Sequence, residues 1–359
     1  MDEVTAAKNI AKAFPQQLGF VNRTALRKSA KQKELEVIPN IGFAHFHHRR
    51  DEQTTIYEIA VYPEKQRLGW GRLLFYRVLA SAIEAGQSNL FLKCPTESIS
   101  NGFYQKLGFM CDRVDPGKKR PLNCWRYKIE VPLLFYCGGG GSSPYDVIAH
   151  EEGWRLGMRS GSGCNPRGHL EMVDNLFTKY THHQHLELVK DTRPFIATAL
   201  DVMTETQCRN NGQTYHPLED ILGWAREISQ YCGRVILIPK YEFEIPNDLR
   251  CWLGYSIPTS HGGTPVSPEW FASQDLPVHL LGGSPDKQRR FSQTKMNVVS
   301  LDGNYAMLLA QRFGKSCWQG NNSGKHVVGG TYNAFRVSLR HQKDYWRNHA
   351  NQYKQLSLF

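Results

Sequence analysis

Apolar and polar residues alternate with two different periodicities along the first third of the chain, and these periodicities predict strands and helices. Residues 42–47 and 54–61 alternate with the period of two that a half-buried strand requires, and residues 89–93 form a shorter run of the same kind. Residues 8–35 and 71–85 instead space their apolar positions three and four apart, as amphipathic helices do. The order of these elements predicts an α+β or α/β module.

The remainder of the chain carries short, continuous apolar runs, and nearly every one ends in a polar or glycine-rich segment. Runs of this kind predict parallel strands that are buried on both faces. Loops that carry chemistry follow the strands at the C-terminal rim of a β/α barrel, so we expect a barrel of the TIM type, abbreviated because the fold usually needs ~250 residues. The runs are residues 194–200, 234–239, 252–257, 277–281 and 297–301.

The segment CGGGGSSP interrupts both the strand and the helix patterns. Four consecutive glycines, two serines and a proline cannot form a regular element, so we expect a linker at residues 137–144. This divides the 359 residues into an N-terminal domain at 1–136 and a barrel domain at 145–340. Residues 341–359 have a helical pattern and are expected to form a C-terminal tail.

Composition narrows the class of protein. The hydrophobic share of 40% is enough to fill buried cores, which excludes a disordered chain. No apolar stretch is long enough for a membrane span, and the first residues lack the pattern of a secretory signal. The nine cysteines show no CxxC spacing, which argues against a structural zinc site. We therefore expect a soluble, cytoplasmic protein without a metal site.

The net charge of +11 is unevenly distributed. Residues 1–135 contain 21 Lys and Arg against 13 Asp and Glu, so most of the basic excess lies in the N-terminal part. A basic surface favours an anionic partner. A phosphate-rich cofactor and a nucleic acid, either DNA or RNA, both fit this charge, and the charge does not choose between them.

A short glycine-containing loop joins the predicted strand at 54–61 to the predicted helix at 71–85. The loop reads QRLGWG, from Gln66 to Gly71. Glycines let a backbone come close to a ligand, and the free N–H groups and dipole of a helix N-terminus favour a diphosphate. The loop therefore predicts an anion site, with an ordinary strand-to-helix turn as the alternative.

This segment resembles motif A of the GNAT acetyltransferases, whose Q/R-x-x-G-x-G/A signature is met by Gln66, Gly69 and Gly71. Further along, Asn101 and the segment FYQKLGF are similar to the later N…FYxKxGF pattern of the family. The resemblance covers roughly residues 10–130. It implies a mixed sheet with flanking helices and acetyl-CoA as the cofactor.

The resemblance also implies a role for individual residues. Backbone amides of residues 66–72 would hold the pyrophosphate of acetyl-CoA, and residues 59–61 would pair with the pantetheine like an added strand. Asn101 would contact the cofactor arm, and Tyr104 would lie near the thioester sulfur. The residues implied in cofactor binding are Ile59, Val61, Gln66, Arg67, Leu68, Gly69, Trp70, Gly71, Arg72 and Asn101.

Acetyl transfer to an amine needs a base, because only a neutral amine attacks a thioester, and the leaving thiolate benefits from a proton donor. Glu58, on the strand before the loop, is the candidate base, and Tyr104 is the candidate acid. The alternatives are a solvated strand residue for Glu58 and a core aromatic for Tyr104.

The amine acceptor is less clearly marked. His47 and His48 are followed by Arg49 and Arg50, a cluster that is best interpreted as an exposed loop and not as a metal site. The sequence leaves the acceptor unnamed.

Carboxylates follow two of the apolar runs in the second half. Asp201 ends one run, and Asp302 ends another in the phrase VVSLDGN. A partly desolvated aspartate at a strand end can act as a nucleophile or a base. The alternative is that each aspartate caps a following helix.

The segments VHLLGGSP and VVSLDGN are similar to the region of tRNA-guanine transglycosylases and their DNA-modifying relatives where YLMGxGxP precedes the catalytic DxFD. The resemblance implies that Asp302 is the nucleophile, that Asp201 ends a base-recognition strand, and that Lys240 replaces a glutamine. Gly282 and Gly283 are candidates for ligand contact through their backbone. The chain departs from the family in lacking its CxCxxC…H zinc site and its PTR segment.

The two resemblances together predict an acetyl-CoA-dependent N-acyltransferase fused to a guanine-transglycosylase-like domain that modifies bases of nucleic acid. The alternative is an acetyltransferase of a small-molecule or protein amine, with the barrel as a non-catalytic module that binds nucleic acid or another ligand.

Overall fold

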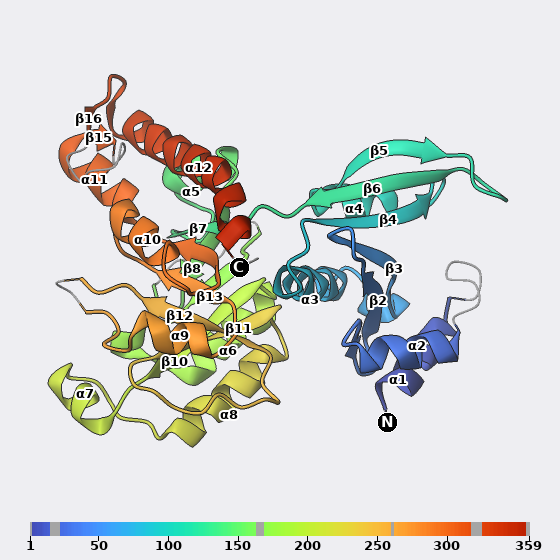
Figure 1. Ribbon diagram of the computed structural model, residues 1–359, viewed down its shortest axis with the longest axis horizontal. Helices are drawn as coiled ribbons and strands as arrows, with labels where there is room; N and C mark the ends of the chain where they lie inside the picture. The colour runs from blue at the N-terminus through green and yellow to red at the C-terminus, as the bar shows by residue number, and fades with distance from the viewer. Residues whose placement is uncertain (1, 15–21, 163–168, 260–261, 317–324, 357–359) are drawn as a thin grey trace. The chain divides into compact units, whose positions relative to one another are not determined.

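The computed structural model describes residues 2–14, 22–162, 169–259, 262–316 and 325–356 (Figure 1). The chain folds into two compact units, Met1–Ile129 and Glu130–Phe359, and each is considered by itself. Within the described ranges, no helix combines the length and the apolar character that a membrane crossing needs.

Unit 1 is built on a six-stranded mixed sheet in the order β1-β2-β3-β4-β6-β5. The β3–β4 pair is parallel and the other neighbouring pairs are antiparallel. This confirms the predicted mixed sheet with flanking helices. The strands are β1 (Leu35–Ile38), β2 (Gly42–His48), β3 (Gln53–Val61), β4 (Asn89–Pro95), β5 (Met110–Asp115) and β6 (Leu122–Lys128); the helices are α1 (Glu3–Ala11), α2 (Arg23–Lys31), α3 (Trp70–Glu84) and α4 (Asn101–Lys106), with a 3₁₀ turn η1 (Pro63–Lys65).

The core of unit 1 fixes which face of the sheet each helix covers. Ile10 of α1 and Leu26 of α2 pack in one cluster with Phe43 of β2 and Ala60 of β3. On β2 the next residue along, Ala44, lies on the opposite face because side chains alternate across a strand. The face that carries Phe43 is therefore the face on which α2 lies.

Strands β3 and β4 pair with each other over only part of their length. The pairs run from Gln53 with Asn89 to Thr55 with Phe91, although β3 continues to Val61. Beyond Thr55, β3 is paired with β2 on its other side. An edge of a strand that has no neighbouring strand keeps its backbone groups available for another extended partner.

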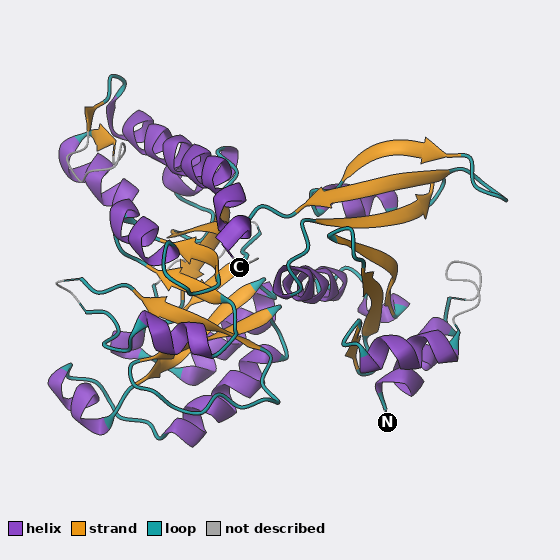
Figure 2. Ribbon diagram, in the orientation of Figure 1, coloured by secondary structure: helices purple, strands orange, loops and turns teal. Residues whose placement is uncertain are grey.

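Unit 2 is a closed barrel of eight strands in the order β7 to β14, in which every neighbouring pair is parallel. Figure 2 shows its strands in orange with helices around them. This confirms the predicted barrel, and the five predicted apolar runs are its strands β10 to β14.

The bounds of the barrel strands are β7 (Leu133–Gly138), β8 (Arg155–Arg159), β9 (Met172–Asp174), β10 (Ile196–Val202), β11 (Arg234–Pro239), β12 (Cys251–Ser256), β13 (Val278–Leu281) and β14 (Val298–Asp302). The other elements of unit 2 are α5 (Pro144–Glu151), η2 (Phe177–Lys179), α6 (His182–Thr192), α7 (Glu205–Asn210), α8 (Leu218–Ser229), α9 (Pro268–Ser273), α10 (Pro285–Ser292), α11 (Tyr305–Phe313), β15 (Lys315–Ser316), β16 (Lys325–His326) and α12 (Gly330–Leu356).

The structure differs from the expected linker at residues 137–144. The first two of these residues belong to strand β7, and the chain divides upstream of that strand, after Ile129. The glycines make a tight βα turn of the barrel, because Gly140 and Gly141 have positive φ angles and Ser143 caps α5 with a capping box to Asp146. A glycine-rich run is equally compatible with a turn and with a linker, which is why the sequence misplaced the boundary.

The expected C-terminal tail at 341–359 is not a separate element within the described residues. It continues a single helix, α12, that begins at Gly330 and packs on the barrel. The ring of Phe335 lies 5.2 Å from that of Tyr136 on β7, and Trp154 donates a hydrogen bond of 3.3 Å from its Nε1 to the Leu339 carbonyl. Residues 357–359 lie outside the described ranges.

Candidate functional site

The loop from β3 to α3 presents the start of a helix beside the end of a strand. Gln66 donates a hydrogen bond of 3.0 Å from its Nε2 to the Val61 carbonyl, which ties the loop to the end of β3. Gly69 occupies the N-cap of α3 with a φ of 86°, in the left-handed region that favours glycine. No acidic residue lies in the first turn of α3. The positive end of the helix dipole therefore meets no competing carboxylate there.

Gly71 shows that this helix start is also a close contact with α4. A Cβ on Gly71 would come within 3.3 Å of the Phe103 ring. Phe103 in turn contacts the ring of Tyr104, with centroids 5.4 Å apart. The sequence-predicted loop and the sequence-predicted acid are thus parts of one packed region of unit 1.

Glu58 is held by a chain of side-chain hydrogen bonds that joins three elements. Its Oε2 lies 3.1 Å from Nδ1 of His45 on β2, and Nε2 of His45 lies 3.0 Å from Oγ of Ser29 on α2. The side chains of His45 and Glu58 are 12% and 16% exposed. The register of β2 and β3 shifts at this point, so Tyr57 is the extra residue of a bulge. The bulge places the Glu58 carboxylate on the face of the sheet that α2 covers.

Tyr104 is half-buried in α4 among aromatic rings. Its ring lies 5.8 Å from that of Phe109, in addition to its contact with Phe103. Burial raises the pKa of the Tyr104 hydroxyl above its ordinary value. The hydroxyl therefore stays protonated throughout the neutral range, as a hydrogen-bond donor must.

The amide of Asn101 is already used inside the protein. Its Nδ2 donates to the carbonyls of Pro95 and Ser98, each at 2.8 Å, and its Oδ1 accepts from Asn123 Nδ2 at 3.0 Å and from Trp125 Nε1 at 2.8 Å. These bonds fix the turn between β4 and α4 against β6. In this conformation Asn101 shapes the site, and its predicted contact with the cofactor arm stays a prediction.

The barrel places three sequence-predicted residues at the C-terminal ends of its strands. Asp201 lies near the end of β10, Lys240 directly follows β11, and Asp302 ends β14. Lys240 Nζ lies 3.1 Å from Asp201 Oδ2, and both side chains are largely buried. The same Nζ donates to the Gly263 carbonyl at 3.2 Å. Lys240 therefore neutralises the Asp201 carboxylate at this position of the rim.

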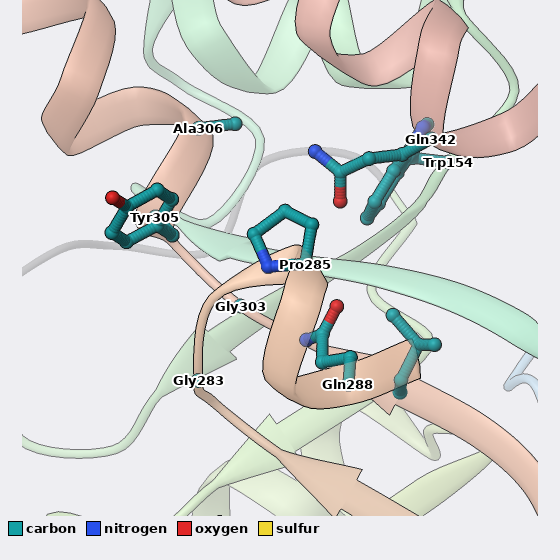
Figure 3. Close-up of a pocket in the computed structure, with 9 residues that line it drawn as sticks. Trp154, Gly283, Pro285, Gln288, Gly303, Tyr305, Ala306 and Gln342 are labelled. Atoms are coloured by element: carbon teal, nitrogen blue, oxygen red, sulfur yellow. The ribbon is translucent and has the colours of Figure 1, made fainter. Parts of the chain in front are cut away.

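Asp302 is bound to the loop that follows β13. Its Oδ1 accepts a hydrogen bond of 2.8 Å from the Gly282 N–H and lies 3.6 Å from Nε2 of the fully buried His279. Gly282 and Gly283 both have positive φ angles. Figure 3 shows Gly283 beside Gln288, whose Nε2 donates to the Gly282 and Asp302 carbonyls at 3.0 and 2.7 Å. Gln288 thus locks the two loops together.

Two further charged residues of this rim were missed in the sequence. Asp174 ends β9, and its Oδ2 lies 3.5 Å from Nε of Arg159 at the end of β8. Its Oδ1 accepts a hydrogen bond of 3.1 Å from Thr198 Oγ1. Burial, reinforced by the negative charge of Asp302, raises the pKa of Asp174 to about 7. The signal in the sequence was LEMVDN, an apolar run that ends in Asp, but β9 is only three residues long.

Two family models match the chain. The model described as acetyltransferase (GNAT) family matches residues 35–109, which extend from β1 past α4 and contain the loop at 66–71. The model described as a family of unknown function (DUF6610) matches residues 149–347, more than half of the chain. Neither model is that of a transglycosylase, so the second resemblance has no support here. No curated protein matches the chain significantly.

Solved structures similar to the chain are acetyltransferases. A putative acetyltransferase of the GNAT family from Desulfovibrio desulfuricans has 17% identity and a TM-score of 0.30, over 35% of this chain and 92% of its own. The ribosomal-protein-S18-alanine N-acetyltransferase from Escherichia coli has 19% identity and a TM-score of 0.30, over 35% and 87%. A putative acetyltransferase from Salmonella typhimurium with its cofactor acetyl-CoA has 16% identity and a TM-score of 0.29, over 36% and 90%.

Proposed function

The chain belongs to the DUF6610 family of unknown function and carries a GNAT acetyltransferase domain in its N-terminal unit, and from this premise we propose that unit 1 transfers an acetyl group from acetyl-CoA to an amine. The observation that carries the proposal is the loop at 66–71, which opens α3 next to an edge of β3 that pairs with no described strand beyond Thr55.

The residues present fit acetyl-CoA. The amides of residues 66–72 would hold its diphosphate at the helix N-terminus, and the edge of β3 at 59–61 would pair with its pantetheine arm. When bound, acetyl-CoA supplies an acetyl group activated as a thioester. The basic excess of unit 1 adds a favourable long-range field for an anionic cofactor.

Glu58 and Tyr104 divide the proton transfers between them. Glu58 accepts a proton from the acceptor amine, which makes the nitrogen nucleophilic, and His45 keeps the Glu58 carboxylate in one orientation. Tyr104 is protonated at neutral pH and provides a hydrogen-bond donor for the leaving sulfur. The proposal leaves the identity of the acceptor open.

Calorimetry and steady-state kinetics test this proposal together. Acetyl-CoA should bind to the full-length protein with measurable heat, and Glu58→Gln should lower kcat by about 10²–10⁴ without weakening that binding. Glu64→Gln, an exposed glutamate in η1, is the matched control and should leave both quantities unchanged. Absence of binding heat would refute the acetyltransferase proposal, and a Glu58→Gln variant with full activity would refute the role of Glu58.

A second proposal concerns the barrel, because charged residues from several strands meet at the rim where barrel enzymes place their active sites. We infer that this rim is a separate active site, with Asp302 as nucleophile and the Asp201–Lys240 pair as a ligand-binding group. Its specific reaction is proposed to be the exchange of a base in DNA or RNA, with Gly282 and Gly283 contacting the base through their backbone.

Incorporation of labelled guanine into DNA or tRNA tests the barrel proposal. The wild-type protein should incorporate label, and Asp302→Asn should not. If neither protein incorporates label, the base-exchange proposal fails.

A further inference from the structure

A groove lies on unit 1 beside the proposed base. It is lined by His47, Arg49, Arg50, Asp51 and Tyr57, which come from the β2–β3 hairpin. The sequence suggested only an exposed loop at these arginines. In the structure both arginines are exposed at the groove, and Tyr57 is 55% exposed.

The groove is connected to Glu58 through its neighbours. The ring of Tyr57 lies 5.0 Å from the ring of His45, and His45 is the residue that binds Glu58. His45, His47 and Arg49 occupy alternate positions along β2 and its extension, so their side chains share one face of the sheet. This row leads from the proposed base to the arginines.

Two buried polar side chains, Ser29 and Glu34, hold the histidines of this row in place. Ser29 binds Nε2 of His45 at 3.0 Å, and the buried carboxylate of Glu34 binds Nδ1 of His47 at 2.8 Å. Glu34 also accepts the His48 backbone N–H at 2.9 Å. The polar floor of the groove is therefore preorganised, which reduces the conformational entropy that the protein loses when a ligand binds.

Two arginines and one aspartate lie among the residues that line the groove. Nε of Arg49 lies 3.3 Å from Oδ1 of Asp51, and this exposed pair leaves the arginine accessible. Arg50 forms no ion pair with any described residue. A guanidinium group presents parallel N–H donors that match the oxygens of a carboxylate or a phosphate.

The strand geometry sets the length of a ligand that spans this row. His45 and Arg49 are four residues apart, which corresponds to about 13 Å along a strand. A molecule with its amine at Glu58 would therefore place a group about 10–15 Å away in contact with Arg49 and Arg50.

We propose that the acceptor of unit 1 is an elongated anion, with a carboxylate or phosphate bound by Arg49 and Arg50 and a reactive amine at Glu58. This inference rests on the proposed acetyltransferase function and deepens it by naming the chemical class of the acceptor.

Four tetrapeptide amides test the proposal, because an extended tetrapeptide places its fourth side chain at about 10 Å or more from its amino group. Each has three alanines followed by glutamate, phosphoserine, glutamine or lysine. The full-length protein should acetylate the glutamate and phosphoserine peptides with kcat/KM at least about tenfold above the lysine peptide, and added salt should reduce the difference. The comparison of glutamate with phosphoserine identifies which anion the groove prefers.

Arginine variants locate the preference. The double variant Arg49→Ala/Arg50→Ala should bring all four peptides within about twofold of one another while acetyl-CoA affinity stays unchanged. Arg23→Ala/Arg27→Ala removes two exposed arginines of α2 outside the groove and should retain the preference. An equal rate for all peptides, a preference that survives in the groove variant, or no transfer to any peptide by protein that binds acetyl-CoA would each overturn the inference. Failure to bind acetyl-CoA would instead overturn the proposed function.

Discussion

Asp174 lowers the free energy of unfolding of the barrel when its buried carboxyl is ionised. Its carboxyl is enclosed at the end of β9 with the charge of Asp302 nearby, and the guanidinium of Arg159, whose Nε lies 3.5 Å from Asp174 Oδ2, offsets only part of the cost of burial. The folded protein therefore keeps this carboxyl protonated up to a pH of about 7, whereas in the unfolded chain the group ionises near its ordinary value of 3.8. Groups with such shifted pKa values are common where proton transfer takes place.

The sign of the pH effect follows from these two values. Between pH 4 and 7 the folded state binds more protons than the unfolded state, so the free energy of unfolding falls as pH rises and levels off above 7. The shift corresponds to an upper limit of roughly 4 kcal/mol.

Asp174→Asn should remove this pH-dependent loss. The asparagine keeps an oxygen for the hydrogen bond from Thr198 but carries no charge. We expect the variant to gain melting temperature relative to wild type, by about 2–4 °C per kcal/mol recovered, and this gain should be larger at pH 8 than at pH 5 because only part of the loss has accumulated by pH 5. Asp220→Asn, an exposed residue of α8, is the control and should show the same small effect at both pH values. A gain that does not depend on pH would contradict the assigned pKa.

Some residues of the two candidate sites can be recognised in the sequence, and others cannot. Asp201, Lys240 and Asp302 stand out in the sequence because each lies at or just after the end of a strand long enough to be recognised. Asp174 was missed because three residues of β9 show no periodicity. The bonding of Asn101 was inaccessible for a different reason, since its partners include Trp125, 24 residues away on β6.

At the scale of elements, the helix start that follows the proposed cofactor loop includes a glycine in the left-handed conformation. Gly69 caps α3 with a φ of 86°, and the opposite end of the same helix is followed by Gly86 with a φ of 67°. An L-residue in the left-handed region costs about 1–2 kcal/mol. The two glycines therefore carry the same kind of strain at the two ends of one helix.

This pair gives a matched test of the loop. Gly69→Ala and Gly86→Ala should each destabilise unit 1 by about 1 kcal/mol, because each variant places an L-residue in the left-handed region. At Gly86 the added Cβ meets no atom within 4 Å, so this backbone strain is the whole effect there. Only Gly69→Ala should weaken acetyl-CoA binding, by about tenfold or more in calorimetry, because only this glycine shapes the amides of the loop. Equal acetyl-CoA affinity in the two variants would show that the loop does not hold the cofactor.

Strand prediction succeeded or failed according to the context of each run. Residues 42–47, 54–61 and 89–93 were recognised as strands, whereas β1 escaped because its four residues lack a clear alternation. Residues 133–136 of β7 fall in the expected N-terminal domain at 1–136, because the glycines that follow them have the composition of a linker. Only the closure of the barrel, a long-range property, shows which sheet β7 joins.

At the scale of the whole chain, the boundary between the two units depends on β7. This strand pairs with β14 on one side, through Leu133 to Phe135, and with β8 on the other. Phe135 and Tyr136 of β7 are almost completely buried, and Tyr136 belongs to the main barrel core. A barrel that lacks β7 would have two open edges and an exposed core, which is the arrangement that leads strands to aggregate.

Two truncated proteins test this boundary. Residues 130–359 should form a folded barrel that unfolds in one cooperative transition, because the compact unit is then complete. Residues 145–359, which start after the expected linker, should be insoluble or unfold without cooperativity, since the loss of a central strand exceeds the about 5–15 kcal/mol that stabilise a typical domain. Circular dichroism during heating and analytical ultracentrifugation distinguish the two outcomes. If the shorter protein unfolds as cooperatively as the longer one, β7 is dispensable to the barrel and the boundary lies at the glycine run after all.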